Sequence, residues 1–483
     1  MINLMANVDK ESVREKVDEI KHQFEQLRAD QKLSAEVIAM ISSMMLIIDL
    51  ILSIFMEKQT KKNTKNSSIP SSQTPEDETS LTESGSKTKG KPEKKTPVFN
   101  TRTVETTQVS KIDICKSCGI DLSMVSVEDY ERRTKIDIIF EKVVEHTDAE
   151  IKQCPKCKTT NKACFPDDLQ GPLQYGNGLK AYIINLLVCQ MVSLNRVQKL
   201  ITSMIGQTLS ESTLLNFIIR LHQALEGWEK ETLEQLLKQA AINVDETGLQ
   251  VNKKKWWVHV YSSGVITLKF INRRRGKQAI EEIGIIEVYM GVIIHDRWSS
   301  YLSYSHCGHG LCGSHLLRDL VFIEESNGYR WATNMKHLLQ EICHIINQSE
   351  DKKLTNKAYA NLQKRYRNIL TRGEKELPEI LPKPKGKRGK LAKSDGHNLW
   401  EAFKKHEKAI LLFAKDPHVS FTNNRAERDL RMTKVKQKVS GCFRTPKYAE
   451  AYCRISSYLQ TMANKGYNPL VSIQMALNGE FEK

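Results

Sequence analysis

The stretch AAINVDETGLQV, residues 240–251, decides the fold, because it is largely apolar up to an acid, Asp245. A run of this kind is typical of a buried strand. The segments KWWVHVYSS (255–263) and VITLKFINRR (265–274) follow it and are rich in β-branched and aromatic residues, which favours two more strands. We therefore predict a sheet that begins with three consecutive strands.

Helices and strands alternate further along the chain. KQAIEEIG (277–284) predicts a short helix, YMGVIIHD (289–296) a buried strand, and HGLCGSH (309–315) another strand that leads into a helix. The order β-β-β-α-β-α-β-α indicates an α/β layer arrangement. Residues 326–420 read as helices interrupted by the basic loop PKPKGKRGK, and a further helix begins near Glu427, with FTNN supplying its cap.

Charge and cysteine usage narrow the class of protein. The 483 residues carry a formal net charge of +16, from 73 Lys and Arg against 57 Asp and Glu. This excess favours a polyanionic partner, since basic side chains displace counterions condensed on phosphates, although a basic protein without a nucleic-acid role is the alternative. The chain has 11 Cys and a polar start without a secretory signal, so we expect metal sites or buried thiols in a cytoplasmic, nucleoid-associated protein.

The N-terminal segment carries a heptad pattern. Apolar residues recur at alternating steps of three and four from Val13 to Phe55, with two polar exceptions. This predicts a coiled coil over residues 1–57, and hence a homo-oligomer that is at least a dimer. The run Val37–Phe55 is 19 residues long, enough to span a membrane. We favour the coiled coil, because the heptad spacing begins in the charged segment before residue 37 and continues through the apolar run, and a membrane-spanning helix would not require this continuity.

A zinc-binding region is expected after a linker. Residues 58–108 are rich in Lys, Thr, Ser, Pro and Glu, which predicts disorder. Two CxxC pairs follow, the first at Cys115 and Cys118 and the second at Cys154 and Cys157. Such pairs suit tetrahedral zinc, each forming one knuckle, and their separation of 35 residues predicts a small strand insert between them. Four unrelated cysteines are the alternative.

Two amphipathic stretches form the next segment. LNRVQKLITSMIG (194–206) and QTLSESTLLNFIIRLHQAL (207–225) predict two helices joined by a short turn at Gly206, with Ser210 as the N-cap of the second. This is a helix-turn-helix-like pattern that would contact DNA, and an ordinary helical hairpin explains it equally well.

Three acids stand at positions where acids are unusual. Asp245 lies within an apolar strand, Asp296 ends a second buried strand, and Glu427 begins a helix. A buried acid is costly unless it is paired or binds a metal, and α/β sheets place ligands at strand ends. Converging carboxylates would bind two Mg²⁺ ions about 3.5–4 Å apart for phosphodiester displacement. In the alternative, the aspartates cap turns and Glu427 is solvated.

Basic residues surround the last of these acids in FTNNRAERDLR (421–431). They would bind a DNA backbone and position it without reading sequence. The predicted DNA-binding residues are Arg425, Arg428, Arg431, Lys434 and Lys436, with Lys387 and Arg388 in the basic loop.

With these motifs, the chain resembles bacterial DDE transposases of the insertion-sequence sixty-six family. The resemblance covers roughly residues 110–480 in family order. It rests on CKSCG…CPKC, FPDDLQGPLQYGNGLKAYI, LSESTLLNFI, VDETGLQV…KWWVHVYSS, GVIIHDRWSSY, LCGSHLLRDL and FTNNRAERDLRMTKVKQKVSGCFRT.

The resemblance implies a multidomain α/β protein with a ribonuclease-H-like catalytic core that a helical insertion interrupts. The expected parts are a coiled-coil helix (1–57), a disordered linker (58–108), a zinc-binding domain (109–170), a helical DNA-binding segment (171–238), the first part of the core (239–325), the insertion with its basic loop (326–420), the helix with the catalytic Glu (421–440) and a C-terminal helical segment (441–483).

The resemblance also implies the chemistry. Asp245, Asp296 and Glu427 would be the acidic triad that holds two Mg²⁺ or Mn²⁺ ions, and the four CxxC cysteines would hold structural Zn²⁺. The enzyme would cleave element ends and attack target DNA with the freed 3′-hydroxyl, with accessory proteins of the same element as further partners. His315, where the family also has a His, is a second candidate near the metals or the scissile phosphate; a packing role is the alternative.

Other functions stay open at this point. A metal-dependent nuclease or integrase on the same scaffold would differ in its products. A DNA-binding repressor or a decayed element protein would bind without cleaving. A second zinc site at His306, Cys307, His309 and Cys312 is conceivable, but their crowding on one predicted strand favours a buried cluster.

Overall fold

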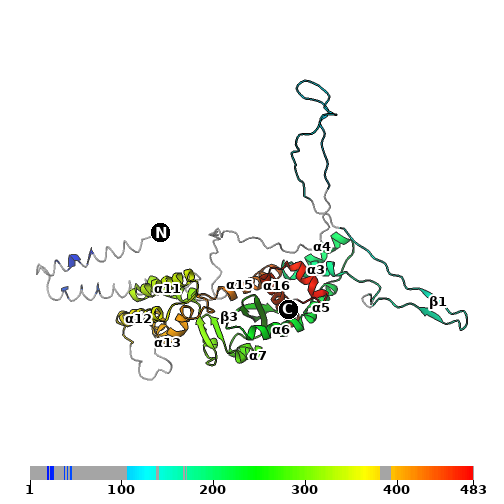
Figure 1. The fold of residues 1–483 in the computed structure, drawn as a ribbon. Helices are drawn as coiled ribbons and strands as arrows, with labels where there is room; N and C mark the ends of the chain where they lie inside the picture. The colour runs from blue at the N-terminus through cyan, green and yellow to red at the C-terminus, as the bar shows by residue number, and fades with distance from the viewer. Residues whose placement is uncertain are drawn as a thin grey trace, which may run out of the picture. The chain divides into compact units, whose positions relative to one another are not determined.

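The computed structural model describes residues 106–136, 141–166, 169, 171–380 and 393–481, and a few separate residues between 19 and 45 (Figure 1). The few residues described in the predicted coiled coil are helical, and the rest of it lies outside the described residues, as does the linker up to residue 105. Within the described part of the chain, no helix is both long and apolar enough to cross a membrane.

The chain forms two compact units. The described residues of the first, here called the sheet unit, lie within 106–311 and 418–481, and those of the second, the insertion unit, lie chiefly within 312–380 and 393–417. The sequence places the insertion at 326–420. The helix that precedes it packs with the insertion helices, so the unit begins 14 residues earlier.

The sheet unit is built on a five-stranded mixed sheet in the order β5-β4-β3-β6-β7. Strands β3, β4 and β5 follow one another in the sequence and form an antiparallel meander. Strands β6 and β7 run parallel to β3. This confirms the predicted run of three strands followed by alternating helices and strands. The strands are β3 (Ala241–Val251), β4 (Lys254–Ser263), β5 (Ile266–Asn272), β6 (Val292–His295) and β7 (Gly308–Leu311), with the short helices α7 (Lys277–Ile283), α8 (Ile285–Val288) and α9 (Ser299–Leu302) between them.

The central position of β3 follows from its sequence. Ile242, Val244 and Leu249 are fully or almost fully buried, as expected of a strand paired on both sides. Gly291 lies directly before β6, where a Cβ atom would collide with the ring of Tyr289 and the carbonyl of Ala240. The glycine in YMGV therefore lets the chain pass close to the start of β3.

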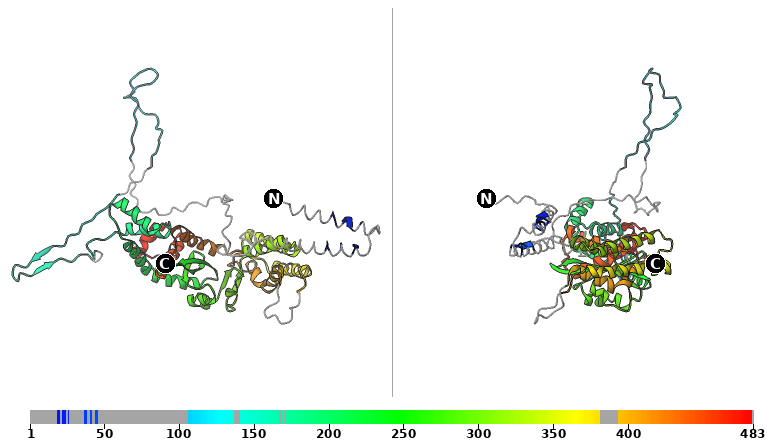
Figure 2. Two further views of the ribbon diagram at one scale, coloured as in Figure 1. Left: turned by 180° about the vertical axis from the view of Figure 1, so that it is seen from behind. Right: turned by 90° about the vertical axis from the view of Figure 1, so that its left-hand side faces the viewer.

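Helices from both ends of the unit cover the sheet. Helix α15 (Asn424–Ser440) packs against β3 and β4, and α16 (Pro446–Lys465) packs against β5 (Figures 1 and 2). Helix α16 also contacts α5, and α17 (Pro469–Leu477) contacts α3. The C-terminal helices therefore share one hydrophobic core with the predicted DNA-binding segment and the sheet.

The predicted helix pair in that segment is present. It consists of α4 (Leu194–Ile205) and α5 (Glu211–Ala224), which lie between α3 (Asn177–Val188) and α6 (Glu226–Leu237). Gly206 ends α4 in the left-handed conformation at φ 68°, and the Ser210 hydroxyl accepts a hydrogen bond from the backbone N–H of Thr213 at 3.1 Å. Both the turn and the cap follow the sequence prediction.

The insertion unit is helical, as predicted. Its core forms around Trp331, Tyr366 and Phe403, with the last two rings stacked at 6.2 Å between centroids. Its helices are α10 (Gly313–Asn327), α11 (Arg330–Gln348), α12 (Asn356–Gly373), α13 (Asp395–Lys405) and α14 (Glu407–Leu411), and the basic loop falls outside the described residues.

Candidate active site and metal centres

Asp245 occupies the middle of β3, on the same face as Asn243. Its side chain is half-buried, and its Oδ1 accepts a hydrogen bond from the backbone N–H of Glu246 at 2.8 Å. Burial raises the pKa of Asp245 well above its ordinary value, and the neighbouring charge of Glu246 raises it further. The charges of Asp296 and Glu427 act in the same direction, so all three acids lie close enough to interact.

Asp296 directly follows β6, at the carboxyl end of a strand parallel to β3. Its Oδ1 accepts a hydrogen bond from the backbone N–H of Trp298 at 3.1 Å, which fixes the turn after the strand. Burial raises the pKa of Asp296. Glu427 also raises it, whereas the hydrogen bond from Trp298 and the positive charge of Arg275 oppose the rise.

Glu427 lies in the first turn of α15, as predicted, and Asn423 sets its position. Asn423 occupies the N-cap position, but its side chain does not bond to the helix, contrary to the expected capping role. Instead its Nδ2 donates to the carbonyl of Val244 at 2.8 Å, and its Oδ1 accepts from Asn243 Nδ2 at 2.9 Å. The start of α15 is therefore fastened to β3 directly beside Asp245.

The three predicted acids thus come from a central strand, a strand end and a helix start that meet in the sheet unit. Among the described residues, they do not form a group whose ligand atoms all lie within 4.8 Å of one another. Burial and neighbouring acids raise the pKa values of Asp245 and Asp296, and a cation bound between these carboxylates would lower them again. Oxygen donors in an open arrangement suit hard cations such as Mg²⁺, which retain water and substrate oxygens.

A fourth acid, Glu246, adjoins this site, and sequence reasoning missed it. Its Oε1 accepts from Arg275 at 2.8 Å and its Oε2 from the Tyr301 hydroxyl at 2.8 Å. Burial and the charge of Asp296 raise the pKa of Glu246 to about 7, although Arg275 opposes the rise. The Arg275 guanidinium lies over the rings of both Trp257 and Trp298, at 4.9 and 4.4 Å from their centroids. The sequence feature that could have identified Glu246 is its position directly after Asp245 in VDETG.

The basic residues of α15 fall into two groups. Arg425 is only partly exposed, and its Nε donates to the buried carboxylate of Asp429 at 2.9 Å. This guanidinium is therefore already paired within the protein. Arg428 and Arg431 are exposed. Lys434 is half-buried; burial lowers its pKa, and the charges of Asp245 and Glu427 oppose the change, which places it near these acids.

Lys436 lies over the ring of Phe443, with Nζ 5.1 Å from the centroid, and burial lowers the pKa of Lys436 to about 8. Lys387 and Arg388 lie outside the described residues.

Two of the candidate histidines bond to backbone carbonyls. His306 donates to the carbonyl of Ile286 and His309 to that of Tyr304, both at 2.8 Å. Of the four residues considered for a second zinc site, only His309 lies on β7. The strand ends at Leu311 and α10 begins at Gly313, so the predicted strand segment 309–315 is partly helical. His315 lies on α10 in the insertion unit, where burial lowers its pKa to about 4, and its catalytic role stays a prediction.

The two CxxC pairs form knuckles of the same design. In each, the first cysteine's N–H donates to the carbonyl five residues on, and its carbonyl accepts from the N–H four residues on, all at 2.9 Å. The residue that closes each turn has a positive φ: Gly119 at 74° and Lys158 at 62°. Hydrogen bonding to Thr159 lowers the pKa of Cys157 to about 7, and backbone hydrogen bonds lower that of Cys115. A lowered thiol pKa favours binding of zinc, because the thiolate is the ligand. Among the described residues, however, the four cysteines do not form a group whose ligand atoms all lie within 4.8 Å of one another, so a zinc site shared by the two pairs stays a prediction.

The strands near the knuckles differ in place from the expected insert. Strands β1 (Ile151–Gln153) and β2 (Thr160–Lys162) form a hairpin that flanks the second knuckle. The hairpin turn itself contains Cys154 and Cys157, so the strands support that knuckle alone.

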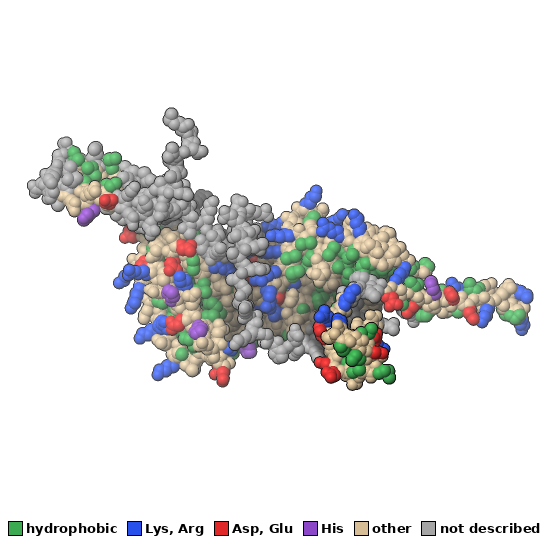
Figure 3. Space-filling model, turned by 90° about the horizontal axis from the view of Figure 1, so that it is seen from above, with side chains coloured by type: hydrophobic (Ala, Val, Ile, Leu, Met, Phe, Trp, Pro, Cys, Tyr) green, Lys and Arg blue, Asp and Glu red, His purple; other side chains and the backbone are tan. Residues whose placement is uncertain are grey.

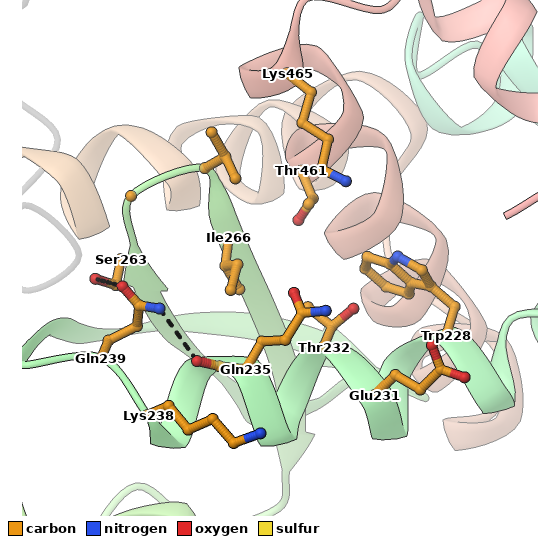
Figure 4. A pocket seen from close by; sticks show the side chains of 12 residues that line it. Trp228, Glu231, Thr232, Gln235, Lys238, Gln239, Ser263, Ile266, Thr461 and Lys465 are labelled. Carbon is orange, nitrogen blue, oxygen red and sulfur yellow. Dashed lines mark hydrogen bonds between the residues drawn. The ribbon is translucent and has the colours of Figure 1, made fainter. Parts of the chain in front are cut away.

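A pocket of about 450 Å³ lies elsewhere in the sheet unit (Figure 4). Side chains from α6, from the turn between β4 and β5 and from the end of α16 line it, including Lys238 and Lys465. None of the acids near β3 lines this pocket. The candidate active site is therefore identified by its converging acids.

Comparison with known proteins agrees with the sequence motifs. A family model described as "Transposase IS66 family" matches residues 172–451, which is more than half of the chain. The matched range contains all three acids of the candidate site and excludes both CxxC pairs. No curated protein matches the chain.

Proposed function

Because the chain belongs to the IS66 family of transposases, we propose that it is a DDE-type polynucleotidyl transferase that cleaves DNA at the ends of an insertion sequence and joins them to target DNA. The observation that carries the proposal is the meeting of Asp245, Asp296 and Glu427 in the sheet unit, where Asp296 and Glu427 raise the pKa of Asp245 and Glu427 also raises that of Asp296. The mixed sheet, with the first acid in its central strand, supports a ribonuclease-H-like core.

These three carboxylates would hold two Mg²⁺ or Mn²⁺ ions, whose charge would relieve the repulsion among them. When bound, such ions activate a water or a 3′-hydroxyl and stabilise the leaving oxygen in phosphodiester displacement. The hydrogen bond of Asn423 to β3 would hold the helix of Glu427 next to Asp245. The ion pair with Arg275 would hold Glu246 beside these acids.

Binding of DNA would involve cations around the acids. Arg428 and Arg431 are exposed on the helix that carries Glu427 and would contact the DNA backbone, and Lys434 would do so near the acids. Arg425 would first have to leave Asp429 to reach a phosphate, so we assign it to holding the helix. The helix pair α4–α5 presents Ser212, Asn216 and Arg220 on its exposed face as further candidates.

The proposal also includes the zinc domain and self-association. Cys115, Cys118, Cys154 and Cys157 would together hold one structural Zn²⁺, and the heptad segment 1–57 would join copies of the chain, as synapsis of two element ends requires. Accessory proteins of the element remain proposed partners.

The test is metal-dependent cleavage of element-end DNA by the full chain. We expect Asp245→Asn to lose cleavage by more than 100-fold while it binds the same DNA with unchanged affinity in the absence of metal. The matched control is Glu450→Gln, which neutralises an exposed acid on α16 and should leave cleavage intact. Wild-type cleavage that persists in Asp245→Asn would refute the proposal, and binding without any cleavage would favour a repressor.

A further inference from the structure

One face of α12 in the insertion unit carries a stripe of basic and amide side chains. Every residue of the stripe is exposed, and successive members are three or four positions apart. At about 100° per residue they fall within a sector of roughly 80°. The members of this stripe, here called the α12 stripe, are Lys357, Asn361, Lys364, Asn368 and Arg372.

The opposite face of the helix fixes its orientation within the unit. Leu362, Tyr366 and Leu370 are buried there. The Tyr366 hydroxyl donates to the carbonyl of Phe403 at 2.9 Å, and Trp400 Nε1 donates to the carbonyl of Leu370 at 2.9 Å. Because this face is held by packing and by hydrogen bonds, the α12 stripe points away from the core.

The acids of neighbouring helices are paired with arginines beside the stripe. Arg365 donates to both carboxylate oxygens of Glu341, at 2.8 and 2.6 Å. Arg367 Nε donates to Glu407 on the other side, at 2.9 and 3.0 Å. Lys357, Lys364 and Arg372 form no ion pair with any described residue. The flanking pairs therefore leave the cations of the stripe uncompensated.

The surrounding segment shares this bias. Residues 326–417 contain 20 Lys and Arg against 10 Asp and Glu, so this stretch supplies 10 of the 16 net positive charges of the chain. Figure 3 shows Lys and Arg side chains at many places on the surface of the described residues, with Asp and Glu side chains among them. A positive surface free of compensating acids attracts a polyanion through counterion release.

We propose that the α12 stripe is a docking surface for duplex DNA, in which Lys357, Lys364 and Arg372 contact phosphates. From the first to the last of these cations the helix rises by about 22 Å, which corresponds to roughly six base pairs. Asn361 and Asn368 lie between the cations and carry amides that hydrogen-bond to base edges or to the backbone. This inference rests on the proposed function, since it gives the insertion a role in holding the same DNA.

Salt dependence of DNA binding tests the proposal. The full chain would be titrated with fluorescent element-end duplex at several salt concentrations, and the slope of log affinity against log salt compared between variants. The triple variant Lys357→Ala, Lys364→Ala, Arg372→Ala removes the cations of the stripe. The control Lys353→Ala, Lys405→Ala, Lys408→Ala removes the same charge from exposed positions of the same unit off the stripe.

We expect the stripe variant to reduce the magnitude of the slope by about 3, roughly one per lost phosphate contact, and the control to change it by less than 1. Equal slopes for the two variants would overturn the proposal, and an acidic protein or plain solvation would then account for the stripe. Thermal unfolding of both variants verifies folding, because exposed Lys→Ala changes in a helix are tolerated.

The two proposals fail in different ways. Wild-type protein that cleaves element ends, with a stripe variant whose slope matches the control, would refute the docking surface alone. Wild-type protein that binds with the expected slope but never cleaves in the presence of Mg²⁺ or Mn²⁺ would refute the proposed function alone.

Discussion

Replacing Asn423 by alanine should displace Glu427 from Asp245 without touching either acid. Asn423 is 1% exposed and fastens the start of α15 to β3 through its hydrogen bonds with Val244 and Asn243. The carbonyl of Asn423 also accepts from the backbone N–H of Glu427 at 3.3 Å, so the fastening point lies one turn from the acid. The substitution removes both side-chain bonds and leaves two partly buried polar groups without their partners.

The size of the effect follows from these contacts. A buried polar group left without a partner costs about 1–3 kcal/mol, so the loss of stability should be about 2–6 kcal/mol for the two groups. Freed of its fastening, the first turn of α15 can move, and a displacement of about 1 Å in a catalytic group costs roughly 100-fold in rate.

The assay is cleavage of element-end DNA as a function of metal concentration, at a temperature where the variant is folded. We expect a rate about 100-fold lower with Mg²⁺, a higher half-saturating Mg²⁺ concentration and partial recovery with Mn²⁺, because Mg²⁺ tolerates distorted coordination poorly. The matched control is Asn424→Ala, one residue on and exposed. If Asn423→Ala lost stability but kept the wild-type rate and metal dependence, the positioning argument would be wrong.

Three other predictions concern stability and metal content. Asp429→Asn should destabilise the protein by about 3 kcal/mol in urea unfolding, because the buried carboxylate accepts hydrogen bonds from Ser262, Thr267 and Arg425; a loss below about 1 kcal/mol would show that the cluster contributes little. Burial lowers the pKa of His259 to about 4, so between pH 6.5 and 4 the unfolded chain binds a proton at this residue that the folded chain does not. On acidification across that window, the free energy of unfolding of the wild type should fall by up to about 3 kcal/mol relative to that of His259→Phe. An equal pH dependence of the two proteins would contradict this. Elemental analysis should find one Zn²⁺ per chain, lost in Cys115→Ser and in Cys154→Ser alike; zinc retained in either variant would show that the knuckles do not share an ion.

The sequence predicted those parts of the fold and site that depend on local patterns. The strand of Asp245, the strand end at Asp296 and the helix of Glu427 were all visible as apolar runs or cap signals, and the structure has each of them. The turn at Gly206 and the cap at Ser210 were likewise local.

Contacts between distant segments could not be predicted in this way. Asn423 looks like a helix cap in sequence, yet its side chain bonds to a strand about 180 residues earlier. Arg425 looks like a DNA contact beside other arginines. Its partner Asp429 lies only four residues on, but the burial of that carboxylate against Ser262 and Thr267 depends on distant strands. Glu246 was hidden because its partners come from distant parts of the chain, Arg275 from the loop after β5 and Tyr301 from α9.

The central claim is that Glu427, Asp245 and Asp296 together perform DNA strand transfer. Its most direct test is a reaction of wild type and Glu427→Gln with element-end DNA, target plasmid and Mg²⁺, with the products resolved at single-nucleotide length. The account predicts joined end–target products for the wild type and none for Glu427→Gln, with end binding retained. Joined products from Glu427→Gln would contradict the assignment of the triad, and cleaved but never joined ends from the wild type would identify a nuclease.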